Sequence, residues 1–179
     1  MLWFNSIHSP TGTLRVGLIQ ALAVSMHIAH LSSHKRLLRE LAEHHFAEWG
    51  HLRPGDSVAS REVRLASVVG EPGSIPSSLV ALDGNDLCGS AMLLASDMGR
   101  SDISPWFAGL YVKPAYRSRG IARLLMHRVL EEARSAGATA IYLCAEVDKL
   151  AFYSSRGWSL HEQCDWHGVP IIVMSRAVG

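Results

Sequence analysis

The sequence predicts a single α/β domain with a mixed, mostly antiparallel sheet and helices on both of its faces. Its 179 residues are about the length of one domain, and an apolar fraction of 48% suffices for a full hydrophobic core. Pairs of apolar runs joined by short turns indicate antiparallel hairpins. Between them, a strand, a helix and a further strand follow one another, which indicates one parallel crossover.

The first part of the domain is predicted to contain a strand and two helices. Met26 to Leu31 is the strand, and Ser32 or Ser33 then caps a helix that ends at Gly50. The apolar residues of this helix fall on one face: Leu37, Leu38, Leu41, His45, Phe46 and Trp49. A second helix, capped by Asp56, is supported by the apolar residues Val58, Val63, Leu65 and Val69.

Two hairpins are expected. The runs Leu79 to Leu82 and Leu87 to Leu94 are joined through Asp83-Gly84-Asn85-Asp86, which is a strong turn signal. The last hairpin pairs Trp158 to Cys164 with Pro170 to Arg176. Both should therefore contribute antiparallel neighbours to the sheet.

The crossover lies between these hairpins. Trp106 to Val112 is its first strand and Ile141 to Cys144 its second. The helix that joins them ends near Gly137 and has apolar residues at helical spacing: Ala122, Leu125, Met126, Val129, Ala133 and Ala136. Asp148 to Arg156 is predicted to be a further short helix.

Composition and charge exclude several classes of protein. A charged fraction of 18%, with 15 Gly and 7 Pro scattered along the chain, excludes a disordered, collagen-like or coiled-coil protein. A net charge of +1 gives no basic field for a nucleic-acid backbone, so we expect no nucleic-acid partner. The cysteines Cys88, Cys144 and Cys164 lie far apart and form no disulfide framework, which favours the reducing cytoplasm.

Residues 1–24 are predicted to be an N-terminal extension of uncertain structure, ahead of a domain that covers residues 25–179. The most apolar stretch, Val16 to Ala29, is interrupted by polar residues and too short to span a bilayer, so we expect no membrane association. A weak signal peptide, with Arg15 before an apolar centre, is the alternative.

One segment carries most of the chemical information, because a strand enters a helix there through a basic turn with a glycine. It reads Leu110-Tyr111-Val112-Lys113-Pro114-Ala115-Tyr116-Arg117-Ser118-Arg119-Gly120-Ile121-Ala122. A helix that begins in this way directs several backbone amides and the positive end of its dipole at one spot. Gly120 lets an anion approach the backbone, and Arg117 and Arg119 add charged, forked donors.

We therefore expect a phosphorylated cofactor at this turn. ATP, GTP and NAD are disfavoured, because the segment has neither a GxxxxGK[ST] nor a GxGxxG pattern. An ordinary strand-turn-helix with solvated arginines is the alternative.

Two motifs resemble those of the GNAT family of N-acetyltransferases. Arg117-Ser118-Arg119-Gly120-Ile121-Ala122 is similar to the family's R/Q-x-x-G-x-G/A signature, after an L-x-V-x-P strand end. Ala151-Phe152-Tyr153-Ser154-Ser155-Arg156-Gly157-Trp158 resembles its later F/L-Y-x-x-x-G-F/W segment. The resemblance covers roughly residues 26 to 177. This sequence departs from the family at Ser118 and Ala122, where many members have glycine, and at Glu146, near a position that is often Asn.

The resemblance implies a GNAT-like fold and transfer of an acetyl group from acetyl-CoA to a primary amine, by direct attack in a ternary complex. Tyr153 falls on the family's tyrosine, which contacts the cofactor and protonates the departing CoA thiolate as a general acid. The pantetheine arm would be contacted by Leu110, Tyr111 and Val112. The pyrophosphate would be contacted by Arg117, Ser118, Arg119, Gly120, Ile121 and Ala122.

The amine must also lose a proton, so a carboxylate, a histidine or a water chain should serve as general base. Glu146 ranks first, because it ends the strand beside the cofactor strand, where the sheet should splay open. The other candidates for the base are Asp97, Asp102, His44, His45 and Glu48. Three aromatic residues could line an acceptor pocket or belong to the core: Trp49, Trp106 and Tyr111.

Metal binding and catalysis by a serine nucleophile have little support in the sequence. His161, Cys164 and His167 have a spacing that suits zinc, but alternation along a strand would direct His161 and Cys164 to opposite faces. No G-x-S-x-G motif occurs. Cys144 is expected to be a buried core residue.

The acceptor amine is left open. It could belong to a small metabolite or antibiotic, a free amino acid or polyamine, or a protein N-terminus or lysine. The alternatives to an enzyme are a non-catalytic acyl-CoA-binding regulatory module with the same fold and a domain for another phosphate ligand. The apolar run Ile171 to Met174 could be an edge that pairs two copies into a homodimer.

Overall fold

The computed structural model describes residues 26–179, so the extension predicted for residues 1–24, with its alternative signal peptide, lies outside the described residues. The elements follow in the order β1 (Met26–His30), η1 (Leu31–Leu37), α2 (Leu38–Trp49), η2 (Gly50–Leu52), α3 (Val58–Ser67), β2 (Ser77–Asp83), β3 (Asp86–Leu94), β4 (Trp106–Val112), η3 (Pro114–Tyr116), α4 (Ile121–Ser135), β5 (Ala140–Glu146), η4 (Val147–Lys149), α5 (Leu150–Ser154), β6 (Ser159–Trp166) and β7 (Val169–Ala177).

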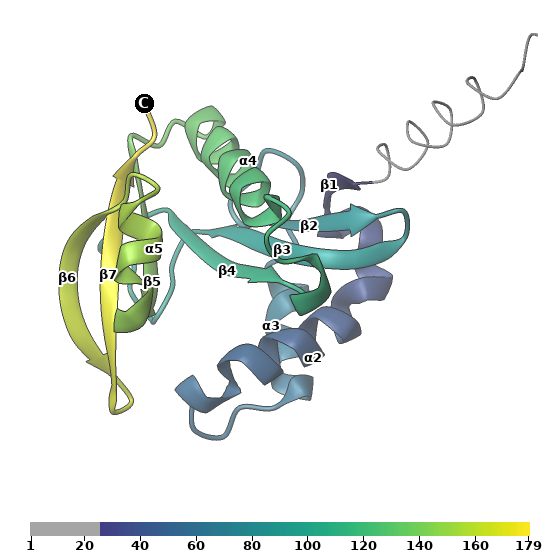
Figure 1. Cartoon of the computed structure of the whole chain (residues 1–179), viewed down its shortest axis with the longest axis horizontal. Coiled ribbons are helices and arrows are strands. Elements are labelled where there is room, and N and C mark those ends of the chain that lie inside the picture. The colour runs from purple at the N-terminus through teal and green to yellow at the C-terminus, as the bar shows by residue number, and fades with distance from the viewer. Residues whose placement is uncertain (1–25) are drawn as a thin grey trace, which may run out of the picture.

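The strands form one seven-stranded sheet in the order β1-β2-β3-β4-β5-β7-β6. All neighbours are antiparallel except β4 and β5, which are joined in parallel by the crossover through α4. Helices α4 and α5 cover one face of the sheet, and α2 and α3 cover the other (Figure 1). The structure thus confirms the predicted fold class.

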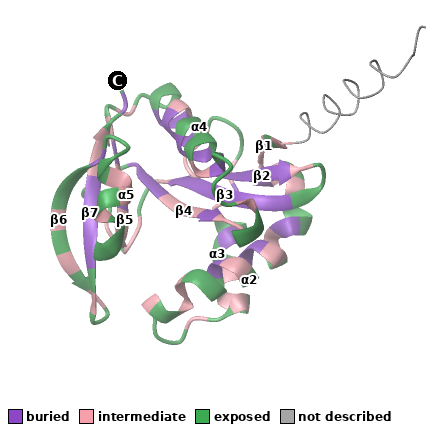
Figure 2. Cartoon of the chain, viewed as in Figure 1, coloured by how far each residue is buried: buried purple, intermediate pink, exposed green. Residues whose placement is uncertain are grey.

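Each face of the sheet has its own core. Leu125, Val129 and Ala133 of α4 are fully buried against one face, and Figure 2 shows the buried stripe that they belong to. On the other face, Leu41 of α2 and Leu65 of α3 pack in a second cluster with residues of β2 and β3. The helical spacing read from the sequence therefore identifies the buried side of α4 correctly.

Both predicted hairpins are present, but the last one is placed differently from the prediction. Strand β7 lies between β5 and β6, so Ile171 to Met174 do not form an edge. These residues are buried because both faces and both edges of β7 are covered, which explains their continuous apolar pattern. The expected pairing of two copies through this run is wrong, since β1 and β6 are the outer strands of the described sheet.

The helices after β1 also differ from the prediction at their ends. The first begins as the 3-10 segment η1 with a kink at His34 (φ −131°), and no serine side chain caps it. The second is capped by Ser57, which accepts from the N–H of Ser60, while the Asp56 carboxylate accepts from the Ser57 N–H. Val63, one of the apolar residues that support this helix in the sequence, is 71% exposed. Capping by a neighbouring serine thus replaced the cap expected from aspartate.

No helix in the described part of the chain is both long and apolar enough to cross a membrane.

Candidate active site

A cleft of about 980 Å³ opens where β4 and β5 separate. The two strands are paired only at Trp106 and Tyr142, and the Tyr142 N–H donates to the Pro105 carbonyl (3.0 Å). Beyond this pair they diverge (Figure 1). The cleft is lined by residues from α2, α3, β4, α5 and the start of α4. The splayed sheet that the sequence predicted beside Glu146 is therefore present.

The start of α4 presents a row of unpaired backbone donors to this cleft. The first backbone bond is donated by Leu124 to the Gly120 carbonyl (3.1 Å). Within residues 26–179, the N–H groups from Ser118 to Arg123 have no acceptor. Such amides, together with the dipole of a 15-residue helix, form a site for a phosphate or pyrophosphate.

A left-handed backbone turns these donors toward one another. Gly120 precedes the helix with φ 81°, and Ser118 has φ 63° although it carries a side chain. An added Cβ at Gly120 would meet no atom within 4 Å, so glycine is favoured there by the positive φ alone. Ser118 thus adopts a left-handed conformation that glycine adopts more readily.

The arginines lie differently from what the sequence implied. The Arg117 Nε donates to the Val112 carbonyl (3.0 Å), and its Nη2 lies 3.4 Å from the Glu48 carboxylate. The Arg119 guanidinium lies 5.1 Å from the centre of the Tyr116 ring and does not line the cleft. Arg123, which the sequence analysis missed, lines the cleft and has no hydrogen-bond or ion-pair partner among the described residues. The sequence held one signal for this role of Arg123, namely its position in the first turn of the predicted helix.

A bulge in β4 shapes the floor of the cleft. Gly109 and Leu110 together oppose one residue of β3, and Gly109 has φ 59°. An added Cβ on Gly109 would lie 2.3 Å from the Met92 Cε. Leu110, expected to contact the pantetheine arm, therefore has no partner in the β3–β4 ladder and lines the cleft with Val112.

His45 supports this bulge. The Ser90 hydroxyl donates to the Gly109 carbonyl (3.0 Å), so the His45 Nε2–H donates to the Ser90 oxygen (2.9 Å). Burial and the nearby Arg61 lower the pKa of His45 to about 3. The ring is therefore neutral at pH 7 and holds the backbone of β4.

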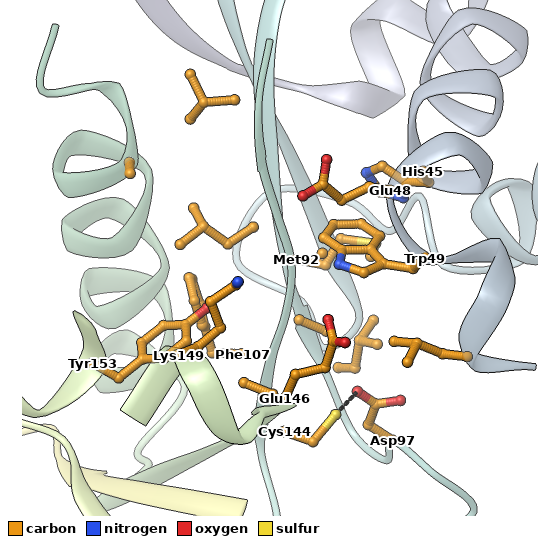
Figure 3. Close-up of a pocket in the computed structure, with 18 of the residues that line it drawn as sticks. His45, Glu48, Trp49, Met92, Asp97, Phe107, Cys144, Glu146, Lys149 and Tyr153 are labelled. Atoms are coloured by element: carbon orange, nitrogen blue, oxygen red, sulfur yellow. Dashed lines mark hydrogen bonds between the residues drawn. The ribbon is translucent and has the colours of Figure 1, made fainter. Parts of the chain in front are cut away.

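Tyr153 of α5 lies on the wall of the cleft that Figure 3 shows opposite Trp49. Its ring packs edge-on against Phe152 and Trp158. Its hydroxyl forms no hydrogen bond with another described residue, and burial raises the pKa of Tyr153 to about 12. The hydroxyl is therefore protonated at neutral pH and available as a proton donor.

Two carboxylates lie between these walls. Glu146 ends β5, and its Oε1 is 3.4 Å from the His51 Nε2. Asp97, from the segment between β3 and β4, accepts from the Cys144 thiol (3.5 Å). Cys144 lines the cleft instead of the core, because it alternates along β5 with the buried residues Ile141 and Leu143.

Two of the aromatic candidates lie elsewhere. Trp106 is fully buried, and its indole N–H donates to the Ile103 carbonyl (2.8 Å). The Tyr111 side chain packs on α2, with its hydroxyl 3.2 Å from the His44 Nδ1, and does not line the cleft. Trp49 alone of the three is at the cleft wall.

No group of three His, Cys, Asp or Glu side chains suited to hold a metal ion occurs in the part of the chain that the structure describes.

The sequence matches the model of the Acetyltransferase (GNAT) family over residues 34–158. The chain belongs to this family. As a GNAT acetyltransferase it is an acetyl-CoA-dependent acyltransferase, and the unpaired amides before α4 fit the pyrophosphate of this cosubstrate. Comparison with curated proteins finds no relative of matching sequence.

Solved structures share the fold of this GNAT acetyltransferase. An acetyltransferase from Streptococcus agalactiae is 17% identical over 86% of this chain and 99% of its own, with a TM-score of 0.65. An aminoglycoside 6'-acetyltransferase of type Ii is 17% identical over 86% of this chain and 97% of its own (TM-score 0.66). A putative acetyltransferase from Salmonella typhimurium, solved with its cofactor acetyl-CoA, is 17% identical over 87% of this chain and 95% of its own (TM-score 0.65).

Proposed function

We propose that this chain transfers the acetyl group of acetyl-CoA to a primary amine, which attacks the thioester directly in a ternary complex. The observation that carries the proposal is the row of unpaired amides at the start of α4, which opens into the same cleft as the Tyr153 hydroxyl. A pyrophosphate at one end of this cleft and a proton donor inside it suit an acyl-CoA whose thioester lies between them.

The cofactor side of the cleft, formed by β4, the turn after it and the start of α4, binds acetyl-CoA mainly through backbone groups. The amides from Ser118 to Arg123 hold the pyrophosphate, with Arg123 adding a charge. The pantetheine arm extends along β4 at Leu110 and Val112, like an added strand. Since the Val112 carbonyl already accepts from Arg117, the bulged residue Leu110 offers the unpaired backbone groups.

In the transfer, the amine nitrogen forms a bond to the carbonyl carbon as the carbon–sulfur bond breaks. The Tyr153 hydroxyl donates its proton to the departing thiolate. A carboxylate in the cleft takes the proton of the amine, and three carboxylates line the cleft: Glu48, Asp97 and Glu146, of which the sequence ranks Glu146 first.

The acceptor side suits an amine that arrives as a cation. It combines the indole of Trp49 with the carboxylates of Glu48, Asp97 and Glu146, which attract an ammonium group. Fold neighbours include aminoglycoside 6'-N-acetyltransferases and a chimera of spermidine N-acetyltransferase, so polyamines and aminoglycosides are the first acceptors to try. The three free cysteines favour a reducing compartment such as the cytoplasm.

The test is the thermal midpoint of unfolding with acetyl-CoA, CoA, ATP or NAD at equal concentrations. A ligand at about 100 times its Kd stabilises the native state by about 2.7 kcal/mol, so acetyl-CoA and CoA should raise the midpoint by several degrees. Release of CoA thiol is then measured with spermidine, an aminoglycoside, lysine and short peptides. A larger shift with ATP or NAD contradicts the proposal, and binding of CoA without amine-dependent thiol release points to the regulatory module instead.

A further inference from the structure

Asp97 is held in the cleft by one backbone N–H and one thiol. Its Oδ1 accepts from the Met98 N–H (2.8 Å), and its Oδ2 accepts from the Cys144 thiol (3.5 Å). Its own carbonyl accepts from the Arg100 N–H (2.8 Å), which closes the local turn and fixes the backbone. Figure 3 shows Asp97 and Glu146 on the same side of the cleft, below the Trp49 indole.

The three carboxylates that line the cleft differ in their partners. Glu48 lies 3.4 Å from the Arg117 guanidinium, and Glu146 lies 3.4 Å from the His51 ring. Among the described residues, Asp97 has no Lys, Arg or His nitrogen within 4 Å. The side chains that act on it are the Cys144 thiol and, at longer range, the Arg53 guanidinium, which lies 5.7 Å from the Trp166 ring centre.

We propose that Asp97 is the catalytic base that takes the proton of the acceptor amine, and that Cys144 is its positioning residue. This inference rests on the proposed acetyl transfer. An acceptor that arrives as an ammonium first releases one proton to solvent. As the new nitrogen–carbon bond forms and the carbon–sulfur bond breaks, a second proton passes from the amine nitrogen to the Asp97 carboxylate, while Tyr153 gives one proton to the CoA sulfur. Each turnover therefore needs Asp97 ionised and Tyr153 protonated, and solvent restores both afterwards.

The surroundings of Asp97 suit this role better than those of Glu146. Burial raises the pKa of the Asp97 carboxyl above its usual range, and no cation in contact offsets this effect. A carboxylate with a raised pKa is a stronger base toward an amine than an ordinary carboxylate, and Asp97 also lacks a contact like that of Glu146 with the His51 ring. Burial also raises the pKa of the Cys144 thiol well above its usual value, so Cys144 remains protonated and keeps donating to Asp97.

The first test compares Asp97→Asn with Glu146→Gln, using spermidine or another amine that the wild-type chain acetylates. Wild-type kcat/KM should rise with pH as Asp97 loses its proton, in a range above the usual pKa of aspartate. Asp97→Asn should lower kcat by about 10²- to 10⁴-fold and remove this acidic limb. Glu146→Gln should act mainly on KM and keep the limb. The shift of the thermal midpoint by acetyl-CoA should be unchanged in both variants.

Stability distinguishes a lost base from a damaged fold. A carboxyl whose pKa is raised in the folded state stabilises that state at low pH and loses this effect as the pH rises through the folded pKa. Asp97→Asn should therefore be at least as stable as the wild type at neutral pH, in spite of its low activity. A variant that is both inactive and markedly less stable at pH 7 would contradict the proposal.

Cys144 provides the second test. Its hydrogen bond favours the ionised form of Asp97, so Cys144→Ala should move the acidic limb to higher pH, and Cys144→Ser, which keeps a donor, should restore it. If Glu146→Gln abolishes the limb while Asp97→Asn keeps the wild-type rate, Glu146 is the base and the inference is overturned. A wild-type chain that neither binds acetyl-CoA nor releases thiol overturns the proposed function as well, which is a distinguishable result.

Discussion

The two sides of the cleft are built in different ways. The cofactor side is one continuous segment, from β4 through the turn to α4, and it offers backbone groups to the ligand. The acceptor side is assembled from α2, the β3–β4 connection, the end of β5 and the β6–β7 hairpin, and it offers side chains. A backbone site tolerates substitution of its side chains, whereas a side-chain site changes its specificity with each one.

On the acceptor side, the segment after α2 contacts β5 and β6, two of the last three strands of the sheet. His51, after α2, lies 3.4 Å from Glu146 of β5, and Arg53 lies over the Trp166 ring of the final hairpin. Both contacts join segments that are about 100 residues apart in the sequence. The shape of the acceptor side therefore depends on tertiary packing, while that of the cofactor side depends on one local turn.

The largest effect is expected from Tyr153→Phe, which separates binding from chemistry. The variant keeps the ring packed against Phe152 and Trp158 but removes the proton donor. We expect kcat to fall by about 10²- to 10⁴-fold, while the midpoint shift caused by CoA stays unchanged, because the proposed pyrophosphate site consists of backbone amides. Thiol release and thermal unfolding measure the two quantities.

Tyr142→Phe is the matched control, because Tyr142 of β5 packs against Trp106 and His161 and does not line the cleft. It should retain the wild-type rate. Equal loss of activity in both variants would show that the effect comes from the packing of β5 and α5. Tyr153 would then not be the proton donor.

A smaller effect, on stability, is expected from Gly109→Ala in the β4 bulge. The new Cβ would lie 2.3 Å from the Met92 Cε, in a backbone conformation with φ 59°. We expect the free energy of unfolding to fall by about 2–4 kcal/mol, from overpacking added to left-handed strain. Denaturant unfolding measures this, and cofactor binding should weaken as well, because the bulge positions Leu110.

Gly99→Ala isolates the cost of backbone strain. Gly99 has φ 71°, but its added Cβ would meet no atom within 4 Å. It should cost only about 1–2 kcal/mol. If the two variants cost the same, the packing of Met92 does not hold the bulge, and β4 is less firmly fixed than the contacts indicate.

The free amides before α4 could be predicted from the sequence because the signals for them are local. A strand end, a basic turn with Gly120 and a helix with a buried stripe are adjacent, so their order alone implies a row of free amides. The first hairpin could be predicted for the same reason, because its turn residues favour a tight turn. The interior place of β7 was not predictable in this way, because a continuous apolar run fits an edge or a centre until the strand order is known.

The acceptor side could be predicted only in part. The roles proposed for Asp97 and Cys144 depend on a contact between residues 47 positions apart, which no spacing rule reveals. Alternation along β5 could have placed Cys144 opposite the buried Ile141 and Leu143. The bulge and its support by His45 left no signal except a glycine in a strand.

The smallest effect is expected from Ser118→Gly, which tests whether the cofactor side uses its backbone alone. Relief of the strain at φ 63°, about 1–2 kcal/mol, is offset by the greater freedom of glycine in the unfolded chain, about 0.5–1 kcal/mol. We therefore expect stability to rise by about 1 kcal/mol or less and the Kd for acetyl-CoA to stay within about threefold. Calorimetric titration measures the second quantity.

Ser118→Val sharpens the same comparison from the opposite direction. A β-branched residue resists a positive φ, so the turn should rearrange and displace the amides between Ser118 and Arg123. Affinity for acetyl-CoA should then fall, although the serine hydroxyl is absent from both variants. If Ser118→Gly weakens binding as much as Ser118→Val does, the hydroxyl itself contacts the cofactor. The cofactor side would then depend on side chains in the same way as the acceptor side.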